Sequence, residues 1–182
     1  MVIGVTGKSG VGKSTLARYI AKTEDMFYLD IDSVGHTVLD DPEIQRQIKE
    51  KFNVEVNSRN RKALGSLVFA NRHNMKELSD ITYAKMKEII YNILETHKDV
   101  VIDWILLPHT EFFDLCDKKI LMVPENEMDR AIKVMERDDI SSEDLAERDK
   151  ASIQYNEKDF DLVIKQTYNI KEVINTYEDS KI

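Results

Sequence analysis

Short apolar runs alternate with helical patterns along the whole chain. Each run is rich in β-branched residues, which is typical of strands buried on both faces of a parallel sheet. Parallel strands need crossover connections, and these are usually helices. The alternation therefore predicts a three-layer α/β fold with a five-stranded parallel sheet, its strands at residues 2–6, 26–31, 100–104, 120–123 and 162–164.

Two intervals between the predicted strands are too long to be simple crossovers. Residues 33–97 contain several helical patterns and no convincing strand, which predicts a helical lobe inserted into the sheet. Residues 125–158 form a second, highly charged helical interval, as expected of a mobile lid. Within a single domain, residues 1–32, 98–124 and 159–182 would then form the core.

The composition limits the class of partner. The 182 residues are 42% hydrophobic and 33% charged, a globular balance. No apolar run approaches the ~18 residues of a membrane-spanning helix. The 34 acidic residues outnumber the 26 basic ones, so the net charge is −8, the wrong sign for a broad face that binds nucleic acid. We therefore expect small-molecule partners, with no nucleic acid and no membrane.

The chain shows none of the usual features of an exported protein. Cys116 is the single cysteine and cannot form an internal disulfide. The N-terminal sequence MVIGVTG enters a strand-like pattern with no cationic flank and no cleavage site. A cytoplasmic location is expected, whereas the oligomeric state is not predicted by the sequence.

A glycine-rich loop follows the first predicted strand. Residues 7–14, GKSGVGKS, match G-x-x-x-x-G-K-[ST], and a helical pattern follows them. Glycine lets such a loop turn its amides toward phosphate oxygens, and the helix N-terminus adds its dipole. Lys13 would contact the β- and γ-phosphates of ATP and Ser14 would bind Mg²⁺. The predicted nucleotide-binding residues here are Gly7, Gly10, Val11, Gly12, Lys13, Ser14 and Thr15.

Carboxylates end the second and third predicted strands. Strand alternation would place Asp30 and Asp32 on the same side, at the edge of the sheet where ligands bind in open α/β folds. Asp32 is the candidate base that accepts the proton of an attacking hydroxyl. Asp30 could equally cap the following helix. Asp103 closes a buried strand and is a candidate Mg²⁺ ligand, although an aspartate there also commonly starts a turn.

The charged interval has a segregated pattern when it is projected onto a helix. One face carries Met128, Ala131, Ile132 and Met135, and the opposite face carries Arg130, Lys133 and Arg137. A cationic face on an acidic protein suits a polyphosphate, and Arg148 on the next helical segment could join it. The alternative is a solvated face whose cations pair with Asp129, Glu136 and Asp138.

These motifs, in this order, resemble the dephospho-coenzyme A kinase family. The resemblance rests on GKSGVGKST, DIDSVGHTV, RKALGSLVF, VVIDWILL, residues 129–148 and FDLVIKQ. It implies ATP-dependent phosphorylation of the ribose 3′-hydroxyl of dephospho-coenzyme A, the last step of coenzyme A synthesis. It also implies a phosphate-loop core, a helical acceptor-binding lobe and a lid. In this family Asp32 would be the base, and Arg137 and Arg148 would contact phosphates.

The chain departs from the family pattern on the acceptor and lid sides. Tyr83-Ala84 stands where the family usually has His-Pro, WILL at residues 104–107 replaces Val-Pro-Leu-Leu, and Ser152 replaces a glutamine. Two alternatives therefore remain open. One is another small-molecule kinase built on the same core, such as a nucleoside monophosphate kinase, and the other is a non-catalytic nucleotide-binding protein.

Overall fold

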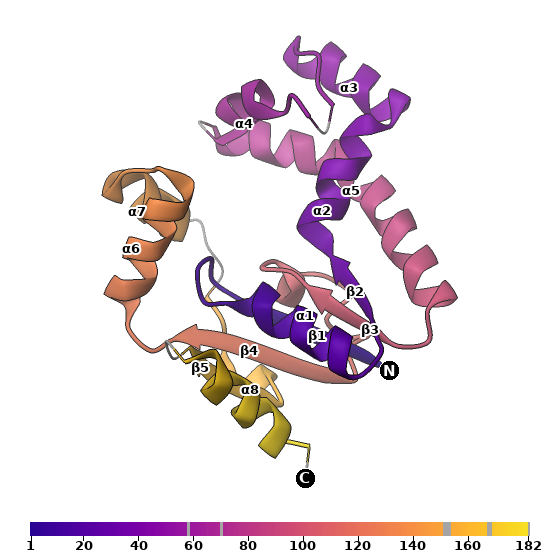
Figure 1. Ribbon diagram of the computed structural model, residues 1–182. Helices are drawn as coiled ribbons and strands as arrows, with labels where there is room; N and C mark the ends of the chain where they lie inside the picture. The colour runs from indigo at the N-terminus through magenta and orange to yellow at the C-terminus, as the bar shows by residue number, and fades with distance from the viewer. Residues whose placement is uncertain (58, 70, 151–153, 167–168, 182) are drawn as a thin grey trace. The chain divides into compact units, whose positions relative to one another are not determined.

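A computed structural model describes residues 1–57, 59–69, 71–150, 154–166 and 169–181 (Figure 1). The chain divides into two compact units. One consists of Met1–Asp30 with Lys98–Ile182, and the other of Ile31–His97. None of the described helices is long and apolar enough to cross a bilayer. The functional division into core, acceptor-binding lobe and lid stays a prediction.

The first unit is built on a five-stranded parallel sheet, as the sequence predicts. The strands lie in the order β2-β3-β1-β4-β5, so β1 is central. Val5 of β1 lies beside Asp103 of β3 and Ile120 of β4, and the carboxyl ends of the strands meet at one edge. The strands are β1 (Val2–Gly7), β2 (Phe27–Asp30), β3 (Val100–Asp103), β4 (Lys118–Pro124) and β5 (Leu162–Gln166).

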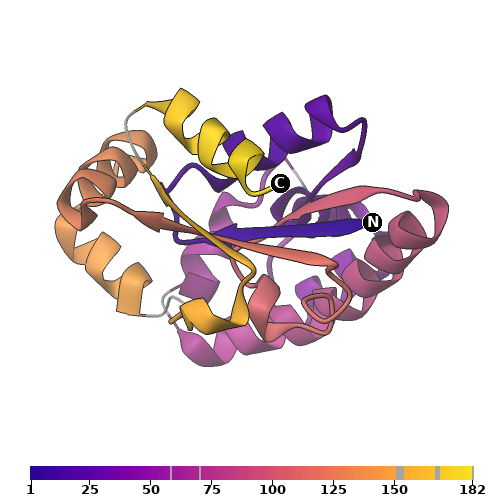
Figure 2. The ribbon, with the colours of Figure 1, turned by 90° about the horizontal axis from the view of Figure 1, so that it is seen from below.

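Helices α1 (Lys13–Thr23) and α8 (Ile170–Asp179) pack on one face of this sheet (Figure 2). Helix α1 buries Leu16, Ala17, Ile20 and Ala21, the stripe that a 3.6-residue period produces. The stripe packs against alternate strand residues, including Ile3, Val5 and Val101. Removal of these apolar side chains from water is the main force that holds the first unit together.

The remaining helices of the first unit follow β3 and β4. A short 3₁₀ helix, η2 (Leu107–His109), precedes β4, and η3 (Glu157–Asp159) precedes β5. Between β4 and β5 lie α6 (Glu127–Asp138) and α7 (Ser142–Lys150), in the interval for which the charge pattern predicts helices. Asn126 caps α6 by accepting hydrogen bonds from the backbone N–H groups of Met128 and Asp129.

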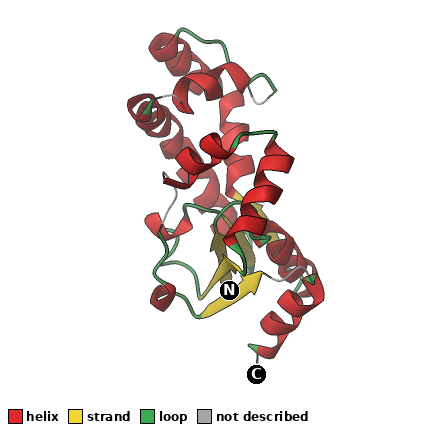
Figure 3. Ribbon diagram, turned by 90° about the vertical axis from the view of Figure 1, so that its left-hand side faces the viewer, coloured by secondary structure: helices red, strands yellow, loops and turns green. Residues whose placement is uncertain are grey.

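The second unit contains helices and no strand within its described residues (Figure 3). Asp41 and Asn71 cap α3 and α5 with their side chains. Leu39, Ile44, Ile48 and Leu64 form part of its core. The elements are α2 (Ile31–Thr37), η1 (Val38–Asp40), α3 (Pro42–Phe52), α4 (Lys62–Phe69) and α5 (Arg72–Thr96).

The boundary between β2 and α2 corrects one prediction. The second strand ends at Asp30, and Ile31 and Asp32 already belong to α2. Strand alternation therefore does not place Asp30 and Asp32 on the same side. Ile31 is completely buried in the helix, so an apolar run that looks like one strand is divided between a strand and a helix.

Gly4 of the central strand faces the segment that precedes β4. A Cβ atom at Gly4 would lie 2.7 Å from both the Cys116 Sγ and the Leu107 Cδ2. Cys116 is itself buried, and burial raises the pKa of its thiol to about 12, which keeps the thiol protonated and poorly reactive. Gly4 thus serves close packing on the face opposite α1.

We expect Gly4→Ala to destabilise the protein by about 1–3 kcal/mol, because one added methyl group overpacks this face. Urea unfolding followed by circular dichroism measures the loss. Gly35→Ala is the matched control: its Cβ would lie 3.4 Å from the Met86 Cε, an ordinary contact, and alanine favours the α2 helix. Equal stability of the Gly4→Ala protein and the parent would contradict the packing account.

Candidate active site

The loop between β1 and α1 turns at three glycines. Gly7, Gly10 and Gly12 have φ angles of 144°, 87° and 86°, which L side chains rarely adopt. A Cβ at Gly7 would overlap the carbonyl oxygen of Met122, and one at Gly10 would lie 2.5 Å from the Val134 Cγ2. Both conformation and space therefore require glycine at positions 7 and 10, as expected of a loop shaped around phosphate.

The first turn of α1 completes this loop. The N–H groups of Thr15 and Leu16 bond the Gly12 carbonyl at 3.0 and 3.2 Å, so the earlier N–H groups of Lys13 and Ser14 have no place in the helical ladder. Such groups form the positive end of the helix dipole. Lys13 and Ser14 are half-buried and Thr15 is exposed. The Val11 side chain lies in the core, so its backbone alone can face a ligand.

Asp103 ends β3 at the same edge of the sheet as this loop. Its side chain is 4% exposed, and the Tyr28 hydroxyl donates a hydrogen bond to its Oδ2 at 2.8 Å. Tyr28 reaches it because Asp30, two residues further along β2, lies beside Asp103 in the sheet. The structure thus gives the buried carboxylate a fixed neighbour, which the sequence analysis did not identify.

Tyr28 is suited to act as a permanent donor. The pKa of Tyr28 is raised above its ordinary value, mainly by burial and next by the hydrogen bond to the negatively charged Asp103. The hydroxyl therefore keeps its proton at physiological pH. The Arg18 guanidinium lies 5.1 Å from the centroid of the Tyr28 ring, a cation–π contact that helps to hold the ring.

Asp32 lies in the first turn of α2, in the second unit. Its side chain is exposed. A carboxylate in this turn interacts favourably with the helix dipole, so local structure alone gives it a stabilising role.

The exposure pattern of α6 differs from the projection made from the sequence. Met128 is 72% exposed and Ile132 is 43% exposed, whereas Arg130 and Val134 are buried. The side of α6 that carries Arg130 and Val134 therefore packs against the protein, and the side with Met128 and Ile132 is exposed. This side contacts the phosphate loop, where Arg130 bonds the Ser9 carbonyl oxygen and Val134 packs beside Gly10.

Two arginines of α6 contact Ser9 of this loop. Arg130 donates from Nη1 to the Ser9 carbonyl oxygen at 3.0 Å, and Arg137 donates from Nη2 to the Ser9 Oγ at 2.9 Å. Arg137 is more than half exposed and also pairs with Asp138. The hydrogen bond to Asp138 raises the pKa of Arg137, and burial opposes this shift in part. The cationic face predicted from the sequence thus includes two residues at the phosphate loop.

Two residues that the sequence analysis singled out, Arg148 and Ser152, cannot be compared with the structure at their side chains. Arg148 belongs to the backbone of α7, but its side chain is not described. Ser152, where the chain departs from the family pattern, is not described at all. Asp149, which the sequence analysis did not consider, is described and bonds Arg130.

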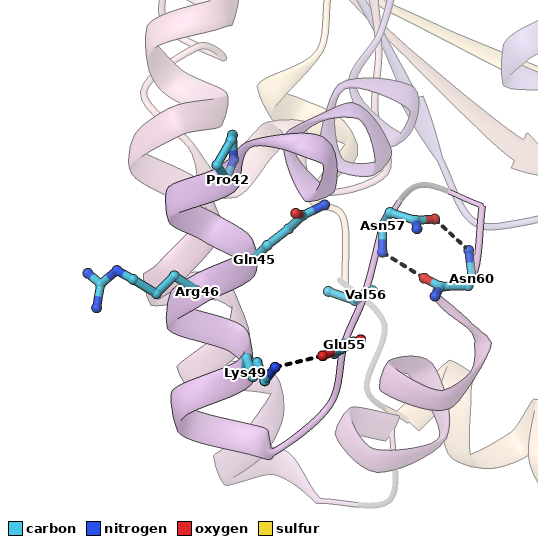
Figure 4. Close-up of a pocket in the computed structure, with 8 residues that line it drawn as sticks. All are labelled: Pro42, Gln45, Arg46, Lys49, Glu55, Val56, Asn57 and Asn60. Carbon is cyan, nitrogen blue, oxygen red and sulfur yellow. Dashed lines mark hydrogen bonds and ion pairs between the residues drawn. The ribbon is translucent and has the colours of Figure 1, made fainter.

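A separate hollow of about 440 Å³ lies in the second unit, beside α3 (Figure 4). Its charged lining residues are already paired: Arg46 with Glu43 and Glu50, and Lys49 with Glu55. Figure 4 shows the Arg46 side chain pointing away from the other lining residues. Because its cations are neutralised, this hollow is poorly suited to a polyphosphate and we assign it no role.

Comparison with solved structures supports the fold. The chain superimposes on the crystal structure of TT1252 from Thermus thermophilus with a TM-score of 0.77, at 23% identity, covering 98% of this chain and 95% of that one. It matches the dephospho-CoA kinase from Campylobacter jejuni with a TM-score of 0.62, at 20% identity, covering 99% and 97%. The sheet topology and the glycine loop are those of a protein with the P-loop fold.

Sequence comparison identifies the family. Residues 1–172 match the family described as dephospho-CoA kinase (CoaE), and the chain belongs to this family. A curated relative, the dephospho-CoA kinase of Fusobacterium nucleatum, is 29% identical over 187 aligned positions, covering 98% of this chain and 95% of the relative. The family consists of ATP-dependent kinases of coenzyme A biosynthesis, so the resemblance drawn from the motifs is confirmed.

The contact between Tyr28 and Asp103 predicts a stability difference. Tyr28→Phe removes a donor from a buried carboxylate and should cost about 1–3 kcal/mol. Tyr19→Phe is the matched control, because Tyr19 donates at 3.2 Å to Glu178, which is 39% exposed and can bond water instead. We expect Tyr19→Phe to lower the free energy of unfolding by no more than about 0.5 kcal/mol, measured by urea unfolding. Similar losses in the two variants would contradict a special role for the Tyr28 hydroxyl.

Proposed function

We propose that the protein transfers the γ-phosphoryl group of ATP to the ribose 3′-hydroxyl of dephospho-CoA. The observation that carries the proposal is the loop from β1 to α1, where three glycines with positive φ precede the N-terminus of a helix. This arrangement suits a polyphosphate because it supplies amides and a helix dipole without desolvating many charged side chains. Family membership supports dephospho-CoA as the acceptor.

The loop would hold the phosphates of ATP. Lys13 would neutralise charge between the β- and γ-phosphates, and the backbone amides would position the chain of phosphates. Positioning and charge stabilisation are the main contributions that a protein makes to phosphoryl transfer. The proposed contacts are Gly7, Gly10, Val11, Gly12, Lys13, Ser14 and Thr15, with Arg148 from α7.

Ser14 and Asp103 are the proposed protein ligands of Mg²⁺. Both offer oxygen, which this hard cation prefers, and the hydrogen bond from Tyr28 orients the Asp103 carboxylate. No cluster of three or more His, Cys, Asp or Glu residues suited to a metal occurs among the described residues. That fits Mg²⁺, which usually combines one or two protein oxygens with substrate phosphates and water. When bound, the ion neutralises charge on the transferring phosphoryl group.

Asp32 is the proposed base. It would accept the proton of the 3′-hydroxyl as that oxygen attacks the γ-phosphorus, so that the alkoxide never forms as a free species. Its exposed side chain leaves the carboxylate accessible to a substrate. Residues 33–97 are the proposed acceptor-binding lobe.

Arg137 is the proposed stabiliser of the transition state. Its exposed guanidinium already reaches Ser9 in the phosphate loop and could exchange this contact for a phosphate oxygen. Residues 125–158 would act as a lid that excludes water from the activated γ-phosphate, because water would otherwise compete with the acceptor.

The acceptor assignment is tested by a panel. With ATP and Mg²⁺ we expect dephospho-CoA to stimulate ADP release strongly, and nucleoside monophosphates or an absent acceptor to give only a small fraction of that rate. Lys13→Ala should abolish the stimulated rate, because the phosphates lose their main cationic contact. Equal rates with and without acceptor would contradict both the kinase function and water exclusion by the lid.

Asp32→Asn tests the base. We expect turnover to fall by ~10²–10⁴ while the dissociation constant of ATP changes by less than about threefold, because the base touches the acceptor alone. Asp114→Asn is a control at an exposed carboxylate outside the proposed acceptor-binding lobe and should keep turnover within about twofold. If Asp32→Asn turns over at the parental rate, the base lies elsewhere.

A further inference from the structure

Arg130 is the largest fully buried side chain of the described residues. Only 1% of its side-chain surface is exposed, although an arginine normally keeps its charge in water. A buried charge is tolerated only when it is paired and hydrogen-bonded. Its partners therefore show what the buried guanidinium does.

The three guanidinium nitrogens of Arg130 bond three different segments. Nε donates to the Glu127 Oε1 at 2.9 Å within α6, and Nη2 donates to the Asp149 carboxylate of α7. Nη1 donates to the Ser9 carbonyl oxygen of the phosphate loop at 3.0 Å. Burial opposes the charge, but Glu127 and Asp149 outweigh it and raise the pKa of Arg130. The two carboxylates thus hold the guanidinium against a backbone carbonyl.

The bonded carbonyl belongs to the peptide unit that joins Ser9 to Gly10. A trans peptide is planar, and its C=O and N–H groups point in opposite directions. A donor that holds the Ser9 oxygen on the α6 side therefore directs the Gly10 N–H away from α6. In a phosphate loop that amide is one of the groups available to bind phosphate.

Gly10 also packs against the same helix. A Cβ at Gly10 would lie 2.5 Å from the Val134 Cγ2 and 3.2 Å from the Arg130 Cγ. The Gly10 φ of 87° leaves glycine as the one residue that adopts this conformation without strain. The loop is therefore packed against α6 at Gly10, and the Ser9–Gly10 peptide has little freedom to rotate.

We infer that Arg130 is a positioning residue for ATP binding: it fixes the Ser9–Gly10 peptide so that the Gly10 amide is presented to phosphate. Asp149 and Glu127 in turn fix Arg130. The inference rests on the proposed placement of ATP at this loop. Arg130 itself touches no phosphate in this account, because its nitrogens are buried and bonded.

The competing account is that Arg130 merely joins α6 to α7. A double variant separates the two accounts, because replacing a buried ion pair with apolar residues often preserves stability. Arg130→Met with Asp149→Leu should keep the thermal midpoint within about 3 °C of the parent. The donor to Ser9 is nevertheless lost, so we expect the dissociation constant of ATP to rise at least about tenfold.

Two single variants test the inference even if the double variant does not fold. Arg130→Lys keeps a charge but has one nitrogen in place of three, so it cannot serve both carboxylates and the carbonyl. We expect its ATP dissociation constant to rise at least about fivefold, with the KM of the acceptor within about threefold. Asp149→Asn keeps the donor to Ser9 and should weaken ATP binding by less than about threefold.

Arg46→Met is the matched control, because Arg46 also bonds two carboxylates but lies exposed on α3. We expect it to bind ATP as the parent does. ATP binding is measured by calorimetry without acceptor, so the outcome does not depend on the acceptor assignment. Unchanged ATP affinity in the foldable Arg130 variants, or affinity that follows stability alone across the set, overturns the inference. A parent that binds no ATP overturns the proposed function as well.

Discussion

An acidic protein that binds a polyanion must concentrate positive potential at one small place. The chain has a net charge of −8, so long-range attraction cannot hold ATP. Backbone amides solve this problem because a loop can aim several N–H dipoles at one point without adding any net charge. The three left-handed glycines and the start of α1 supply such amides, and the central position of β1 anchors them. The other features of the proposed site depend on this arrangement.

The buried side chains around the loop likewise add little net charge. Arg130 is neutralised by Glu127 and Asp149, so its guanidinium adds hydrogen-bonding direction more than net charge. Asp103 receives a neutral donor, the Tyr28 hydroxyl, and stays available to a cation. Lys13 and Arg137 remain partly accessible, and these two are the cations proposed to meet the phosphates.

The fold and the loop could be predicted from the sequence because their signals are local. β-Branched runs define the five strands, and the spacing of glycines with Lys13 and Ser14 defines the loop. The end of the second strand at Asp30 could not be predicted in this way. Ile31 would be buried in a strand and is buried in the helix, so the apolar pattern does not distinguish the two structures. The roles of individual site residues, including Asp32, remain predictions.

Contacts between segments that are distant in the sequence could not be predicted from the pattern of residues. Helical projection places Met128 and Ile132 on an apolar face, but it assumes that this face is the buried one, and the structure buries Arg130 and Val134 instead. The partners Tyr28 for Asp103 and Asp149 for Arg130 depend on strand register and on the packing of two helices. The contact of Tyr28 with Asp103 could have been anticipated, because Tyr28 and Asp30 are two residues apart and point to the same face of the sheet, and Asp30 pairs with Asp103.

The bond between Arg130 and Ser9 has a consequence for how the protein acquires its shape during synthesis. It joins residues 121 positions apart, and closing a loop of that length has an entropic cost that local turns do not have. The glycine motif precedes α6 and α7 in the chain, so it is translated before them. The peptide between Ser9 and Gly10 gains its buried donor only after α6 and α7 have been translated and folded, so nucleotide affinity would mature late, with the C-terminal half of the chain.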